Sequence, residues 1–268
     1  WPDVELLPVS PFYRLNWPDG TNFDYTKDDA AFQRELARIA PADIAGYEEF
    51  LAYSEAAYRE AYQRLAHTPL LGLSSTLRAV PYFARYQGWR SLYSRVSSFV
   101  RSPKLREALS FYTLLVGGNP MTASAACALM HKLGRSNGLW WPRGGINRLV
   151  AAMARHFERL GGTLYLNDPV VRIETLGNRA TGVRTRSGRQ IACDAVVSNA
   201  DIMHSYRDLL GDSLRGKAHA RTLTRKRFSP GTFVVHFGVE GSWPGIQHHM
   251  VLFGPRYRGL FEDIFDLG

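Results

Sequence analysis

A pair of glycines, Gly144 and Gly145, stands directly before a segment whose apolar residues recur at helical spacing. A helix is expected from Asn147, as its N-cap, to Leu160, with a second Gly-Gly pair ending it. The first N–H groups of a helix have no partner within the helix and can bind a phosphate or a carbonyl oxygen. The spacing alone favours a plain glycine-rich turn, and an anion-binding turn is the functional interpretation.

The titratable side chains form no recognisable catalytic or metal-binding set. His131 has only Cys127 one helical turn before it, and His204 has only Asp208 one turn after it. A zinc site needs three or four ligands, so ordinary core or surface positions are the better interpretation. Any chemistry is therefore expected to depend on a bound cofactor.

Arginines and aromatic residues alternate through residues 77–101, LRAVPYFARYQGWRSLYSRVSSFVR, and no acidic residue occurs between Glu60 and Glu107. Basic helices with Trp and Tyr lie at bilayer interfaces, where the rings sit among headgroups and the guanidiniums bind lipid phosphates. A solvated helix face and a nucleic-acid surface are the other interpretations. We expect a membrane lipid surface as partner and no nucleic acid. The residues expected to contact the membrane are Arg85, Trp89, Arg90 and Tyr93.

The first half of the chain is expected to open with strands and to continue with helices. Short apolar runs in residues 4–25, on either side of a PDG turn, predict a β-hairpin. Helical spacing and prolines predict helices over residues 28–66 with a break near Pro41, over 76–101 with a break near Pro81, from Pro103 to VGGNP, and from Pro120.

The second half is expected to add strands around two helical segments. In NDPVVRIE, Val171 and Ile173 share an apolar face, and Pro169 indicates that this strand begins at a sheet edge. Residues 201–227 are expected to be helical and basic. Further strands are predicted at 180–186, at 189–193 after a Ser187-Gly188 turn, at 195–199 in a buried position, and in GTFVVHFGV and HHMVLFG.

Composition bounds the class of protein. The chain has 268 residues, 45% of them hydrophobic, which is enough for a sizeable core. No apolar run approaches the roughly 20 residues that span a bilayer. The two cysteines have no metal-like spacing and indicate a reducing, cytoplasmic compartment. The net charge of +9 favours an anionic partner.

The first residue is Trp1 and the final segment has no tail pattern, so both ends look cut. Helices between groups of strands predict an α/β (α+β) architecture.

Several segments follow one another almost from end to end: VELLPVSPFYRL, GYEEFLAYSEA, GWRSLYSRVSSF, SFYTLLVGGNP, WWPRGGINRLV, LGGTLYLNDPVVRIET, VVSNADIMHSYRDLL and FGPRYRGLFEDIF. Together they resemble the bacterial phytoene desaturases, carotenoid-pathway flavoproteins of the amine-oxidase-like group. The resemblance implies FAD as cofactor and part of a two-domain FAD-dependent oxidoreductase fold, with mixed sheets and an inserted helical substrate and membrane region.

The resemblance also implies a domain plan in which this chain is the middle of the enzyme. The family's G-x-G-x-x-G dinucleotide loop and its C-terminal flavin segment would lie outside the 268 residues. The implied parts are substrate-domain strands at 1–27, a helical substrate and membrane-associated region at 28–138, the returning part of the FAD-binding domain at 139–200, and substrate-domain strands and a helix at 201–268.

Site residues follow from the same likeness. Val170 matches a position whose backbone meets the adenine, and Arg78 matches an arginine close to the substrate channel, the one catalytic candidate. The family often has an acidic residue three positions earlier, where this chain has Ser75, so an acid–base role there is in doubt. The residues that match flavin-contacting segments are Arg143, Gly144, Gly145, Asn199 and Ala200.

The implied reaction is stepwise removal of hydrogen from phytoene toward lycopene, with hydride passing to flavin N5 and a proton leaving the neighbouring carbon. The substrate is an apolar hydrocarbon dissolved in membrane, which fits a cytoplasmic enzyme held peripherally on the bilayer. An isomerase or a desaturase of another carotenoid, and a non-catalytic peripheral lipid-binding module, are the alternatives. The fragment by itself is expected to be inactive.

Overall fold

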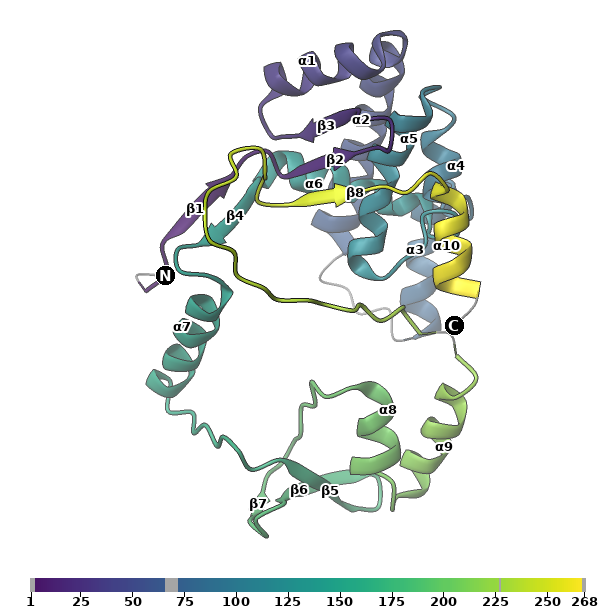
Figure 1. The fold of residues 1–268 in the computed structure, drawn as a ribbon. Helices are drawn as coiled ribbons and strands as arrows, with labels where there is room; N and C mark the ends of the chain where they lie inside the picture. The colour runs from purple at the N-terminus through teal and green to yellow at the C-terminus, as the bar shows by residue number, and fades with distance from the viewer. Residues whose placement is uncertain (1–2, 66–71, 227, 267–268) are drawn as a thin grey trace. The chain divides into compact units, whose positions relative to one another are not determined.

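The computed structural model describes residues 3–65, 72–226 and 228–266, and the chain divides into two compact units. The larger unit is built from residues 1–148 and 229–268, and the smaller from residues 149–228. Both mix helices with small sheets, so the expected mixed α/β class is confirmed at that level (Figure 1).

The larger unit contains the expected hairpin. β2 (Tyr13–Asn16) and β3 (Asn22–Tyr25) pair antiparallel, and Gly20 in the turn between them has φ +82°. β8 (Met250–Leu252), which was expected from HHMVLFG, adds to β2 in parallel and gives the order β3-β2-β8. A second pair joins distant segments, because β1 (Leu6–Val9) lies antiparallel to β4 (Leu139–Pro142).

The helices of the larger unit begin largely where capping residues predict. Asp28 accepts from the N–H of Ala31 at the start of α1, and Ser102 with Pro103 opens α5. The expected breaks at Pro41 and at VGGNP are confirmed. The helices are α1 (Asp29–Ile39), η1 (Pro41–Asp43), α2 (Ile44–Ala57), η2 (Tyr58–Leu65), α3 (Leu73–Arg85), α4 (Leu92–Val96), α5 (Pro103–Ser110), η3 (Phe111–Val116), η4 (Ala125–Ala128), α6 (Leu129–Asn137) and α10 (Tyr257–Asp266).

Two helix boundaries differ from expectation. α3 continues through Pro81, which lies on its exposed side, and the chain leaves the helix only at Gln87, whose φ is +50°. The helix expected from Pro120 starts later, because Asn119 holds a turn by accepting from the N–H groups of Met121 and Ala123. The positions of Pro81 and Pro120 therefore did not predict these two helix boundaries, which depend on local hydrogen bonding.

Aromatic rings dominate the core of the larger unit. Phe23, Phe32, Tyr47 and Phe50 are almost completely buried. The rings of Tyr25, Phe32, Tyr47 and Phe50 surround the buried His131. Among the described residues, no helix is both long and apolar enough to cross a membrane.

The smaller unit is a three-stranded antiparallel sheet with helices. The strands at 180–186 and 189–193 and the Ser187-Gly188 turn are confirmed, with the order β5-β6-β7. Of the helical segment expected over 201–227, residues 202–209 and 214–223 are helical and residues 210–213 form a turn, while residue 227 lies outside the described residues. The elements are α7 (Ile146–Arg159), whose first turn belongs to the larger unit, β5 (Val170–Leu176), β6 (Arg179–Thr185), β7 (Gln190–Ala192), α8 (Ile202–His204), η5 (Ser205–Leu209) and α9 (Leu214–Leu223).

Two expected strands do not form. Residues 195–199, expected as a buried strand, and residues 231–239 are irregular, and Val197 and Phe233 are 96% and 95% exposed. A strand exists only when a neighbour takes up its backbone hydrogen bonds, and no described strand pairs with either segment. The strand prediction was wrong at both places for this chain.

Candidate functional site

The turn at residues 143–145 joins β4 to α7 and needs glycine at two positions. Gly144 and Gly145 have φ values of +83° and +92°, which other residues adopt only with strain. A Cβ on Gly144 would meet the Arg148 side chain at 3.2 Å, whereas a Cβ on Gly145 would meet nothing within 4 Å. Open space therefore lies beside the Gly145 backbone, and a ligand can approach it closely.

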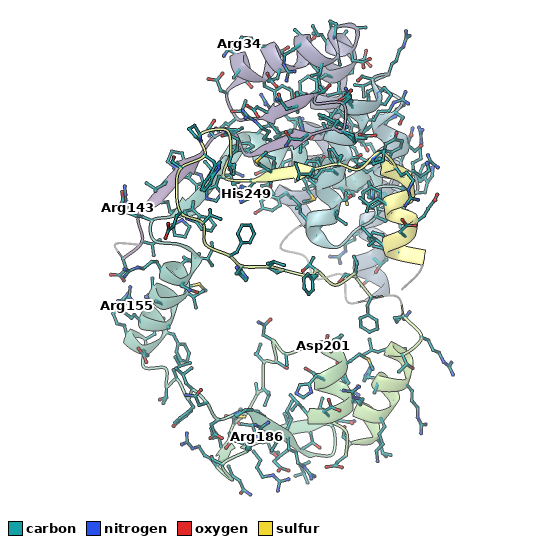
Figure 2. The ribbon with its side chains drawn as sticks, in the orientation of Figure 1. Arg34, Arg143, Arg155, Arg186, Asp201 and His249 are labelled. Carbon is teal, nitrogen blue, oxygen red and sulfur yellow. The ribbon has the colours of Figure 1, made fainter. Side chains whose placement is uncertain are left out.

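Arg143 is held by a carboxylate. Its Nε and one terminal nitrogen donate to the two carboxylate oxygens of Glu5 at 2.6 and 2.9 Å, and its own N–H donates to the Glu5 carbonyl at 2.8 Å. Figure 2 shows Arg143 at this turn. The hydrogen bond from Arg143 lowers the pKa of Glu5 below its usual value. The guanidinium therefore orients the turn and is not a free cation for a phosphate.

The helix after the turn begins one residue earlier than expected. α7 starts at Ile146, so Asn147 lies inside the first turn and the prediction that it caps the helix was wrong. The residue before the helix is Gly145, whose positive φ already turns the chain. The first N–H groups of this 14-residue helix follow directly on the glycine pair.

Val170 opens β5, which lies at an edge of its sheet as expected from Pro169. Val170 is 36% exposed and pairs with Thr185 on one side, which leaves the other side of β5 without a strand neighbour in the described chain. A register shift between Val170 and Arg172 displaces Val171, which is exposed although an apolar face was expected there. Ile173 alone carries the buried face.

The motif SNAD, residues 198–201, forms the turn directly before α8. The Asp201 carboxylate accepts from the N–H groups of Met203 and His204 at 2.9 and 3.0 Å, and so caps the helix. The Ser198 hydroxyl accepts from the N–H of Ala200 at 3.4 Å and shares a 2.8 Å hydrogen bond with the Ser205 hydroxyl. Asn199 and Ala200 are exposed within this turn, so the motif has a clear local structural role.

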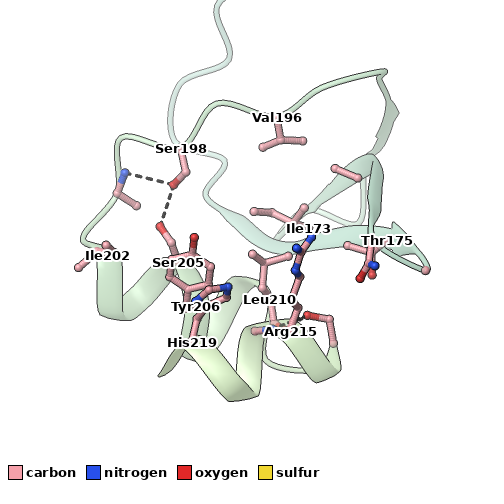
Figure 3. Close-up of a pocket in the computed structure, with 16 residues that line it drawn as sticks. Ile173, Thr175, Val196, Ser198, Ile202, Ser205, Tyr206, Leu210, Arg215 and His219 are labelled. Atoms are coloured by element: carbon pink, nitrogen blue, oxygen red, sulfur yellow. Dashed lines mark hydrogen bonds between the residues drawn. The ribbon is translucent and has the colours of Figure 1, made fainter. Parts of the chain in front are cut away.

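A cavity of about 620 Å³ lies between the sheet of the smaller unit and its helices, and Ala200 forms part of its wall (Figure 3). Its volume falls in the range of roughly 300–1,000 Å³ typical of small-molecule sites. The rings of Tyr206 and His219 lie 4.9 Å apart, and Arg215 is on the same helix one turn before His219. Apolar walls come from Ile173, Val196, Ile202 and Leu210.

Sequence reasoning missed this cavity. Arg215 and His219 are four residues apart, which was the available signal, but helical spacing of two polar residues is too common to indicate a site. Ala200, expected beside a flavin, and Ile173, expected on an apolar strand face, both line this cavity. Gly144 and Gly145 belong to the larger unit, whereas Val170, Asn199 and Ala200 belong to the smaller.

The basic aromatic stretch divides into free and engaged side chains. Trp89 is 73% exposed, and Arg78 and Arg85 are exposed, with Arg85 paired to Glu60 at 3.0 Å. Arg90 is half-buried and donates to the Ser94 hydroxyl at 3.0 Å. Tyr93 is half-buried against the core, with its ring 6.1 Å from that of Tyr257.

Within the described residues, no group of three His, Cys, Asp or Glu side chains could hold a metal ion. Cys127 and Cys193 are both free thiols. Burial raises the pKa of the Cys127 thiol, which makes it a poor nucleophile.

Comparison with known proteins identifies the family. The model of the flavin containing amine oxidoreductase family matches residues 2–264. The chain belongs to this family. It is 47% identical to the lycopene-forming phytoene desaturase of a Paracoccus species over 98% of this chain and 52% of the relative, and 44% identical to that of Pantoea ananas over 98% and 54%. It is 38% identical to the neurosporene-forming phytoene desaturase of Cereibacter sphaeroides over 98% of this chain and 51% of the relative.

These matches confirm the resemblance to the phytoene desaturases, and the chain spans about half the length of the relatives it matches. The described residues fit a flavin in part. The open space beside Gly145 and the free edge of β5 suit the close approach of a flat ring. A glycine-rich cradle for a dinucleotide phosphate does not occur in the sequence, and Arg143 is already occupied by Glu5.

Proposed function

We propose that this chain is the substrate-binding and flavin-facing portion of an FAD-dependent phytoene desaturase, which converts phytoene toward lycopene in carotenoid biosynthesis. The observation that carries the proposal is the 47% identity to a lycopene-forming relative across 98% of the chain. Family membership supports the flavin, and the relatives' names support the substrate.

The residues proposed to hold FAD belong to two groups. Gly144 and Gly145 would lie against the flavin, because Gly145 has open space beside its backbone. Val170 would meet the adenine through the free edge of β5, and Asn199 with Ala200 would lie beside the flavin. When bound, FAD supplies the chemistry that accepts hydrogen from a carbon–carbon unit. We propose that its phosphates are held by residues outside this chain.

The chain's own contribution to catalysis is binding and the exclusion of water. Phytoene offers neither charge nor hydrogen-bonding groups, so its affinity must come from burial of apolar surface, worth about 25 cal/mol per Å². The larger unit supplies rigid apolar walls of packed aromatic rings. Arg78, exposed on α3, is the residue proposed to lie near the substrate channel, while the family's acidic partner is replaced by Ser75.

Peripheral attachment to the cytoplasmic face of a membrane is the proposed route of substrate supply. α3 buries Ala79, Tyr82 and Tyr86 against its own unit. Its other side exposes large apolar side chains beside arginines, an arrangement that suits a lipid interface. The exposed apolar residues are Leu77 at 59%, Val80 at 50%, Phe83 at 43% and, just after the helix, Trp89 at 73%. Trp89 is its principal proposed contact, because Arg90 and Tyr93 are engaged within the unit and Arg85, although exposed, is paired to Glu60.

The proposal is tested with the longer protein that contains this chain, mixed with FAD and with liposomes carrying phytoene. We expect phytoene to be consumed and products with longer conjugated chains to form, separated by chromatography, and no conversion without FAD. A neurosporene-forming relative exists, so the end product distinguishes a lycopene-forming enzyme from one that stops earlier. A flavin-loaded protein that leaves phytoene unchanged would overturn the proposal.

A further inference from the structure

A second, smaller cavity lies inside the larger unit, where the hairpin meets η3 and α6. Its volume is about 100 Å³, and no charged side chain is among the residues that line it. The walls are mainly aromatic and come from segments far apart in the sequence. The principal residues are Phe12, Tyr13, Tyr25, Phe111, Tyr112 and Met130.

The aromatic walls are held rigidly by one another. The rings of Tyr13 and Phe111 meet edge to face at 5.6 Å, and those of Phe111 and Tyr112 at 6.1 Å. Phe12 and Tyr25 lie 6.1 Å apart on the hairpin side. Such pairs lock the ring orientations, so the shape of the pocket is set before any ligand enters.

The hydroxyls of Tyr25 and Tyr112, two tyrosines of the lining, are buried within the unit. The Tyr25 hydroxyl is hydrogen-bonded to Nδ1 of the buried His131, whose Nε2 meets the Tyr47 hydroxyl at 3.1 Å. The Tyr112 hydroxyl is buried and has no hydrogen-bond partner. The pocket therefore presents mainly carbon surface, which suits a hydrocarbon group.

One glycine in the wall keeps space open. Gly134 lies inside α6 and is half-buried, yet a Cβ built on it would meet nothing within 4 Å. Glycine is a poor helix former and its φ here is ordinary, so backbone geometry does not require it. A larger residue at position 134 would fill the open space beside the helix.

We propose that this pocket binds the branched end of an isoprenoid hydrocarbon and that Gly134 sets how much of the chain can enter. The pocket is small and apolar, which matches a terminal branched unit and not a whole long polyene. The inference rests on the proposed function for its physiological ligand, whereas the binding site itself is argued from the lining residues alone.

The test uses the longer protein that contains this chain, labelled with carbon-13 at its methionine methyl groups, and a Met130→Leu variant assigns the Met130 signal. β-Farnesene, a short branched isoprenoid hydrocarbon, is titrated while the methyl spectrum is recorded. We expect a saturable shift of the Met130 methyl, with the Met153 and Met203 signals of the smaller unit unchanged. Gly134→Leu should weaken this binding by about tenfold or more, and Gly134→Ala should leave it within about twofold.

The outcomes separate this inference from the proposed function. A Met130 signal that does not respond, or a response that is equally strong in a folded Gly134→Leu chain, overturns the pocket assignment. The unperturbed methyl signals of the other methionines report whether each variant is folded. If the longer protein desaturates phytoene but farnesene does not bind in this pocket, the pocket assignment is wrong and the proposed function stands. If farnesene binds in this pocket but phytoene is not desaturated, the proposed function is wrong and the pocket assignment stands.

Discussion

His131 lies in the core of the larger unit, completely buried between the hydroxyls of Tyr25 and Tyr47. Burial, followed by the charges of Arg135 and Lys132, lowers its pKa from 6.5 to about 3. The imidazole is therefore neutral in the folded protein at ordinary pH, and it joins two tyrosines that would otherwise have unpaired hydroxyls. His131, for which an ordinary core or surface position was expected, is thus a structural hydrogen-bonding centre of the core.

This burial predicts a pH dependence of stability. Below pH 6.5 the unfolded chain protonates His131, whereas the folded chain stays neutral until about pH 3. The contribution of His131 is therefore complete above pH 6.5 and is lost as the pH falls toward 3, by up to ~1.4 kcal/mol per pH unit. Urea unfolding of the native chain and of His131→Gln measures it. The native chain should lose more stability with acid than the variant, and equal slopes would contradict this account.

Gly145 and Gly134 form a matched pair of glycines. Gly145→Ala should lower the free energy of unfolding by about 1 to 3 kcal/mol, because alanine would be forced to φ +92°. Gly134→Ala should be neutral or slightly stabilising, since the helix favours alanine and the space is open. Urea denaturation of both variants measures the difference. A Gly145→Ala chain as stable as the native one would show that the turn relaxes.

At the scale of elements, turn and capping residues correctly predicted the turns and helix starts that depend on neighbouring residues. The PDG turn and its flanking apolar runs gave the β2–β3 hairpin, and Ser102-Pro103 gave the start of α5. The pairing of β1 with β4 could not be predicted, because it joins segments more than 100 residues apart. The residues of either strand do not indicate which other strand it pairs with. The segments 195–199 and 231–239 have strand-like composition, but composition cannot supply a hydrogen-bonding neighbour.

The exposed apolar side of α3 predicts association with anionic membranes. The chain should float with liposomes that contain anionic lipid and should be released by salt, because the arginine contribution is screened. Trp89→Ala should weaken flotation, whereas Trp140→Ala, which removes an equally large ring that is 50% exposed on β4, should not. Flotation that is insensitive to lipid charge, or equal loss in both variants, would argue against a specific interface at this helix.

At the scale of the molecule, the candidate site was only partly predictable. The glycines at 144 and 145 could be predicted because their positive φ values follow from a Gly-Gly turn before a helix. The engagement of Arg143 by Glu5 could not, since the two residues are brought together only by the β1–β4 pairing. The cavity of the smaller unit likewise depends on how its sheet and helices pack.

The absence of a G-x-G-x-x-G motif from the sequence predicts weak cofactor binding. We expect the 268-residue chain to bind FAD poorly, and the longer protein to bind it tightly. Titration followed by the change in flavin fluorescence measures both. A tight, stoichiometric yellow complex of the 268-residue chain would show that its own residues suffice for the phosphates.

The central claim is tested most directly in a bacterium that accumulates phytoene and lacks its own desaturase. The gene that encodes this chain, with all of its coding sequence, is expressed there and the pigments are extracted. We predict that phytoene declines and that coloured, longer-conjugated carotenoids, lycopene among them, take its place. Unchanged phytoene in cells that contain the folded, FAD-loaded protein would contradict the account.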